Sequence, residues 1–140
     1  MRTREDIEAY LLRSSHPHRE IAESTWLVGD LSGSREHVVV RIEDGLCLFR
    51  LKVLDLTSID PKQTGELYLE LLRINAAEMV HASYGVADGM VLLTASLLLE
   101  NLDFNEFAAT LEELAIAMTN HHERIAKFRR QDGGAATSNA

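Results

Sequence analysis

Residues 38–53 read VVVRIEDGLCLFRLKV, and residues 82–97 read ASYGVADGMVLLTASL. Each stretch has an Asp-Gly pair at its centre, at residues 44–45 and 88–89, with apolar residues on both sides. Asp-Gly between two β-type runs is the strongest short-range hairpin signal, because both turn residues adopt positive φ. The sequence therefore predicts two β-hairpins, and a helical pattern follows each of them.

A two-residue turn fixes which residues of a hairpin share a face. In the first hairpin one face is wholly apolar and is expected in the core: Val38, Val40, Ile42, Cys47, Phe49, Leu51 and Val53. The opposite face is mixed: Val39, Arg41, Glu43, Leu46, Leu48, Arg50 and Lys52. In the second hairpin the expected core face holds Ala82, Tyr84, Val86, Val91, Leu93 and Ala95, and the opposite face includes Met90 and Leu92.

A helix is predicted over residues 61–79, with Asp60 as its N-cap and Pro61 as its first residue. Its polar stripe is narrow: Glu66, Glu70, Arg73 and Ala77. The apolar arc spans about twice the ~100° that a surface helix usually needs. We therefore expect this helix to bury two faces, one on its own sheet and one against something else.

A longer helix follows Asp103, which is its expected cap, and carries apolar residues at 3,4 spacing as far as Phe128. This pattern fits either a coiled coil or packing on the chain's own sheet. His121 occupies one apolar position, where it would be a satisfied, half-buried residue or a pH-sensitive interface residue. Near the N-terminus, Thr3 and Asp6 predict a capping box and a short helix. Residues 19–36 are ambiguous, with a strand at 24–28 and a loop at 29–34 as the interpretation.

The length of 140 residues suits one domain, expected over residues 1–130, with a disordered tail at 131–140. The net charge of −8 disfavours nucleic acid and anionic membranes and suits a basic partner. The single cysteine fits a reducing compartment, and no signal peptide or membrane span is expected. These features favour a cytoplasmic protein.

No catalytic or metal-binding pattern emerges from the chemistry-bearing residues. The six histidines and Cys47 lack the spacing of a zinc site, and Cys47 falls on the predicted core face. The carboxylate pairs lie on polar stripes or turns, where a solvated position is the simpler interpretation: Glu112-Glu113, Glu66/Glu70 and Glu43-Asp44. We therefore expect no enzyme activity and no cofactor.

The helical segment from Glu66 to Asn75, ELYLELLRIN, resembles the "LL-x-x-N" helix of the small acidic type III secretion chaperones and their YbjN-like relatives (CesT-like proteins). The hairpin over residues 81–99 and the Asp103-capped final helix also fit that family. The resemblance implies homodimers that hold an extended segment of a partner protein on apolar surface without ATP. YbjN-like members are called regulators.

We therefore predict an α+β fold: one antiparallel sheet of about five strands, packed by two main helices plus an N-terminal helix. The predicted function is a non-enzymatic, homodimeric protein-binding module. Dimer contacts are expected from Tyr68, Leu69, Leu72 and Met79, and partner contacts from Val39, Leu46, Leu48, Met90 and Leu92. The alternative is a ligand-sensing regulatory domain with Arg41, Arg50 and Tyr84 around a small anion, although Tyr84 falls on the opposite face from the arginines.

Overall fold

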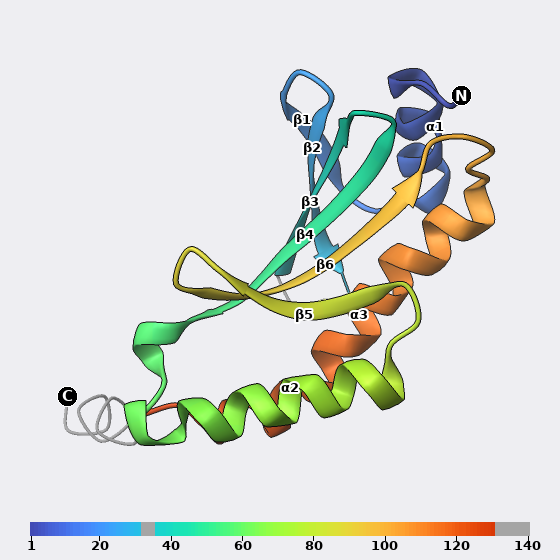
Figure 1. The fold of residues 1–140 in the computed structure, drawn as a ribbon. Helices are drawn as coiled ribbons and strands as arrows, with labels where there is room; N and C mark the ends of the chain where they lie inside the picture. The colour runs from blue at the N-terminus through green and yellow to red at the C-terminus, as the bar shows by residue number, and fades with distance from the viewer. Residues whose placement is uncertain (32–35, 131–140) are drawn as a thin grey trace.

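The computed structural model describes residues 1–31 and 36–130 and folds them into an α+β structure (Figure 1). Its elements in chain order are α1 (Arg4–Ser14), β1 (His18–Ala22), β2 (Thr25–Leu31), β3 (Glu36–Glu43), β4 (Leu46–Asp55), α2 (Thr64–Glu78), β5 (Ala82–Ala87), β6 (Met90–Leu98) and α3 (Phe104–Ala126), with 3₁₀ turns at Leu56–Ser58 and Pro61–Gln63. The strands form one antiparallel sheet in the order β1-β2-β3-β4-β6-β5. The predicted class is confirmed, and the described sheet has six strands instead of about five. The predicted tail, 131–140, lies outside the described residues.

Both predicted hairpins are present, as β3–β4 and β5–β6. All four Asp-Gly turn residues have positive φ, between 52° and 79°. The registers are the predicted ones, with Glu43 opposite Leu46 and Val86 opposite Val91. The two hairpins join through antiparallel pairing of β4 with β6.

The prediction for residues 19–36 was incomplete. β1 has no apolar alternation, because it is an edge strand with an almost wholly exposed surface. β2 continues to Leu31, so Gly29 belongs to a strand instead of a loop. A Cβ on Gly29 would lie 2.6 Å from His37 Nδ1, which explains a glycine within a strand. The remainder of the predicted loop, residues 32–34, lies outside the described residues.

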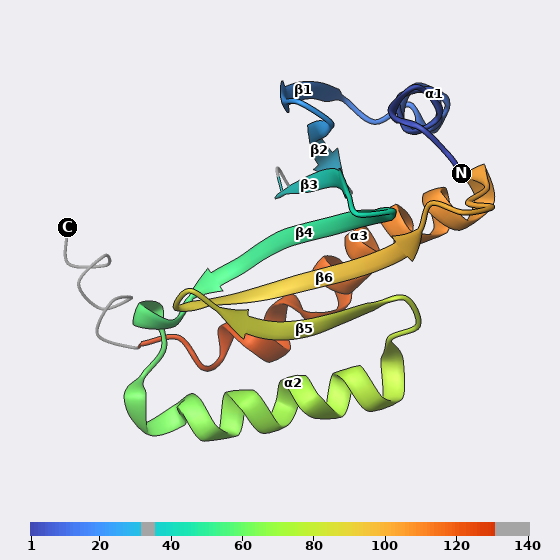
Figure 2. The same ribbon diagram turned by 45° about the horizontal axis from the view of Figure 1, so that its top comes forward.

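The core lies between one face of the sheet and the helices α1 and α3, and the inner side of α2 adds to it beside β5 (Figure 2). Tyr10 of α1, Phe107 of α3 and Phe49 of β4 form a continuous aromatic cluster of tilted rings, with ring centroids 5.5 and 5.4 Å apart. The apolar stripe of α3 is thus buried against its own sheet, so its 3,4 pattern reflects packing on the sheet and not a coiled coil.

Val53 was predicted in the core but sits in a β-bulge, and Leu54 takes the buried position.

Helix α2 runs alongside β5 at the edge of the sheet (Figure 2). Asp60 caps a 3₁₀ turn that precedes the helix, through Oδ1 and the backbone N–H of Lys62 at 3.0 Å. The opposite, outer face of the sheet has none of the described helices over it (Figure 1). Among the described helices, none is long and apolar enough to cross a membrane.

Candidate partner-binding surfaces

The outward face of α2 carries three exposed apolar side chains, here called the helix patch: Tyr68, Leu69 and Leu72. Leu72 is 63% exposed and Leu69 is 41% exposed. Leu72 lies four residues from Tyr68 and three from Leu69, which makes it a neighbour of both on the helix surface. Met79, the fourth residue predicted for this surface, is half-buried and packs against the core. Val80, which sequence reasoning missed because it follows the helix, is exposed.

Contacts made by the inner side of α2 fix the helix so that the helix patch faces outward. Leu67, Leu71 and Ile74 are buried in the core. Asn75 extends the attachment to β5, because its Oδ1 accepts from the backbone N–H of Tyr84 at 2.7 Å and its Nδ2 donates to the Tyr84 carbonyl at 3.0 Å. The side-chain amide therefore occupies the free edge of β5 as a neighbouring strand would.

Arg124 of α3 joins the two long helices through two carboxylates of α2. Its Nε donates to Glu70 at 2.9 Å, and one terminal nitrogen donates to both oxygens of Glu78 at 3.0 and 2.8 Å. The hydrogen bonds from Arg124 and His121 lower the pKa of Glu78. Glu70 was predicted on a solvated stripe, and the ion pair corrects that interpretation.

His121 of α3 is buried and connects β5 to α2. The Tyr84 hydroxyl lies 2.7 Å from its Nδ1, and Glu78 Oε1 lies 3.1 Å from its Nε2. Burial raises the pKa of the Tyr84 hydroxyl. The Tyr84 side chain therefore lies on the core side of the sheet. It does not line one pocket with Arg41 and Arg50, as the ligand-sensing alternative required.

Glu113 of α3 binds the connection between α2 and β5. Its carboxylate accepts the backbone N–H groups of Val80, His81 and Ala82 at 2.6, 2.8 and 2.8 Å. The prediction of a solvated Glu112-Glu113 pair is thus wrong for Glu113, while Glu112 is exposed. A contact between residues more than thirty positions apart leaves no signal in local sequence spacing.

The outer face of the sheet has a shallow cavity of about 500 Å³, here called the outer trough. Val39 and Leu48 contribute apolar surface, and Arg41 and Arg50 contribute charge. The other lining residues are Ala22, Thr25, Phe49, Thr94, Ala95 and Ser96. Two of the five residues predicted for partner contact, Val39 and Leu48, therefore line one depression.

The other three predicted partner residues lie outside the trough lining. Leu46 and Met90 are half-buried, and Leu92 is only 5% exposed. Leu98, which pairs with Leu46, is 68% exposed and was missed because the hairpin pattern assigned no role to the end of β6.

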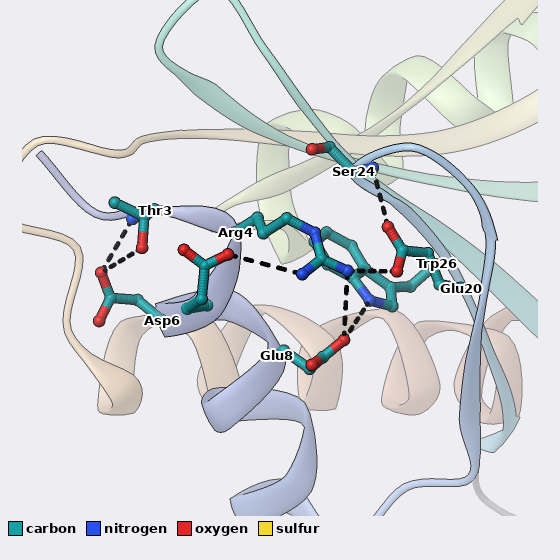
Figure 3. A network of polar contacts seen from close by, with 8 residues as sticks. Thr3, Arg4, Asp6, Glu8, Glu20, Ser24 and Trp26 are labelled. Atoms are coloured by element: carbon teal, nitrogen blue, oxygen red, sulfur yellow. Dashed lines mark hydrogen bonds and ion pairs between the residues drawn. The ribbon is translucent and has the colours of Figure 1, made fainter.

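A polar network fastens α1 to the β1–β2 hairpin (Figure 3). Arg4 bridges Glu8 of its own helix and Glu20 of β1. Glu8 also accepts from the indole N–H of Trp26 at 3.3 Å, and Glu20 accepts from the Ser24 backbone N–H at 3.1 Å. The network holds α1 over the core face, on the side of the sheet away from the outer trough.

The structure places the cysteine and the potential metal-ligating side chains as follows. Cys47 is buried, and burial raises the pKa of its thiol to about 12, which opposes formation of the nucleophilic thiolate. Within residues 1–31 and 36–130, no three His, Cys, Asp or Glu side chains are grouped as metal ligands.

A second cavity of about 410 Å³ between β4 and α3 is lined by Val53, Leu54, Met118, Thr119, His122, Ile125, Ala126 and Arg129.

Comparison with known proteins agrees with this architecture. The sheet and helices resemble YbjN from E. coli, with a TM-score of 0.61, 14% identity, and coverage of 87% of this chain and 94% of that one. A chain of the heterodimeric ExoU–SpcU complex from the type III secretion system of Pseudomonas aeruginosa gives a TM-score of 0.59 at 16% identity, covering 89% of this chain and 98% of that one. A chain of the ExsC–ExsE complex gives 0.59 at 15%, covering 94% and 99%.

No curated protein matches this sequence. The family model CesT_Tir_1 matches residues 1–131, which confirms the resemblance to CesT-like chaperones noted from the sequence. The chain therefore belongs to the CesT_Tir_1 family.

Proposed function

We propose that this chain is a non-enzymatic, cytoplasmic protein-binding module that dimerises through the helix patch and holds a partner segment on the outer face of its sheet, without ATP. The observation that carries the proposal is the exposure of Tyr68, Leu69 and Leu72 on a helix whose other side is locked in place. Clustered apolar side chains of this kind mark interaction surfaces. Membership of the CesT_Tir_1 family supports a partner-binding role.

We assign dimerisation to the helix patch and partner binding to the outer trough because the two surfaces differ in chemistry. The helix patch is apolar and carries aromatic and leucine side chains, as the centre of a homodimer interface does. The outer trough combines apolar surface with arginines and hydroxyls, a mixture that is typical of interfaces with a separate protein. The ExoU–SpcU and ExsC–ExsE structures are complexes of two different proteins, which supports a protein partner here.

The double substitution Leu69→Asp/Leu72→Asp tests the dimer interface. We expect light scattering to give twice the 15.7 kDa monomer mass for the wild type and the monomer mass for the variant, because each subunit would bury two carboxylates in the interface. Leu12→Asp is the matched control, since Leu12 is an exposed helical leucine on α1, and it should remain dimeric. A folded double variant with an unchanged mass would show that the helix patch is not the interface.

A further inference from the structure

We propose that the outer trough selects an acidic, apolar segment of a protein partner, with carboxylates of that segment held by Arg41 and Arg50. The inference rests on the proposed function and specifies the chemistry of the partner at the sheet face. It reverses the sign that the whole chain would favour, because the net charge of −8 attracts basic partners.

The arginines and the apolar residues of the trough alternate on two adjacent strands. Arg41 of β3 lies opposite Leu48 of β4, and Val39 of β3 lies opposite Arg50 of β4. The four side chains thus form a chequerboard, with a cation and an apolar group in each row. A ligand that presents carboxylate and apolar groups side by side complements this arrangement.

The two rows that contain the chequerboard continue across the neighbouring strands without an acidic residue. One row is Thr25, Arg41, Leu48 and Ser96, and the other is Leu27, Val39, Arg50 and Thr94. The threonine and serine hydroxyls can also donate hydrogen bonds to a carboxylate. These rows carry two cations and no carboxylate, and the acidic residues paired with the arginines, Glu43 and Asp88, lie outside them, so an acidic segment can complement the rows.

The existing ion pairs leave both arginines available. Arg41 lies 2.6 Å from Glu43, and Arg50 lies 3.6 Å from Asp88. Arg41 and Arg50 are 52% and 49% exposed despite these pairs. Exposed pairs contribute little free energy, and a guanidinium has five N–H donors, so each arginine can also bind a partner carboxylate.

The test uses three nonapeptides with acetylated and amidated ends, Leu-Ser-Glu-Ser-Leu-Ser-Glu-Ser-Leu and its counterparts with Gln or Lys in place of Glu. In an extended peptide, alternate residues reach one face, so Leu and the variable residue face the trough together. Amide chemical shifts of the isotopically labelled full chain report the affinity and locate the peptide. We expect the Glu peptide to bind about tenfold more tightly than the Gln peptide, with the Lys peptide weakest.

Substitution of the arginines is the decisive comparison. Arg41→Gln/Arg50→Gln should remove the preference for Glu, and Arg41→Glu/Arg50→Glu should transfer it to Lys. Arg129→Glu/Arg130→Glu changes the net charge equally but lies after the end of α3 and outside the trough lining, and it should leave the preference intact. Added salt should weaken binding of the Glu peptide more than that of the Gln peptide, because exposed charges are screened.

The outcomes separate this inference from the proposed function. Equal binding of all three peptides at the trough, reduced by Val39→Thr/Leu48→Asn, would overturn the acidic preference and leave the partner-binding face intact. Preference for the Lys peptide in the wild type would likewise overturn it. Failure of every peptide to shift the trough amides would overturn both the inference and the proposed sheet-face contact.

Discussion

At the scale of single residues, the α2–β5 connection depends on Glu113, which accepts three consecutive backbone N–H groups. Helix ends and connections need such partners, because an unpaired backbone N–H loses its hydrogen bond to water without replacement. Asn75 likewise binds backbone at the edge of β5, where it accepts from the Tyr84 N–H and donates to the Tyr84 carbonyl. Both residues act on backbone, so their contribution is to the position of α2 and not to a reaction.

Glu113→Gln should reduce the free energy of unfolding by about 1–3 kcal/mol, because the amide offers one acceptor oxygen and no negative charge to three donors. Glu112→Gln is the matched control at the preceding, exposed position and should change stability by less than about 0.5 kcal/mol. Urea unfolding of the two variants beside the wild type provides the measurement. Equal effects of both substitutions would mean that the three contacts add nothing to stability.

At the scale of elements, α2 is attached to α3 through Arg124, Glu70 and Glu78. The pKa of Glu78 is lowered in the folded chain, so the unfolded chain binds its proton more readily. The stabilisation that Glu78 provides is therefore present above its ordinary pKa of 4.5 and is lost as the pH falls through the lowered value.

Glu78→Gln tests this linkage. The wild type should be more stable than Glu78→Gln at pH 7, and the difference in urea midpoint should shrink when the pH is taken below the ordinary pKa of the carboxyl. Glu66→Gln, an exposed position on the same helix, should keep the pH dependence of the wild type. If Glu78→Gln retained that pH dependence in full, Glu78 would not be the linked group.

The elements also differ in how far the sequence predicts them. The hairpins were predictable with their registers, because Asp-Gly turns fix the pairing locally. β1 was not, because an exposed edge strand needs no apolar face. The two-sided character of α2 was visible in its apolar arc, but Met79 faces the core, since its position depends on how the chain leaves the helix. The contacts of Glu113 and Arg124 depend on tertiary packing alone.

At the scale of the whole molecule, α1 and α3 cover one face of the sheet, α2 lies beyond β5, and none of the described helices covers the outer face (Figures 1 and 2). The helix patch and the outer trough are therefore separate surfaces. A dimer formed through α2 would leave one trough open on each copy. Two copies would then offer two sites to a partner, whose binding is strengthened when both are engaged.

The most direct test of the α2 interface is nuclear magnetic resonance on a mixture of isotopically labelled and unlabelled chains, in which only contacts between copies are recorded. The account predicts intermolecular contacts from the Leu69 and Leu72 methyl groups and the Tyr68 ring. A dimer without contacts from these three side chains, or a monomer at the same concentration, would contradict it.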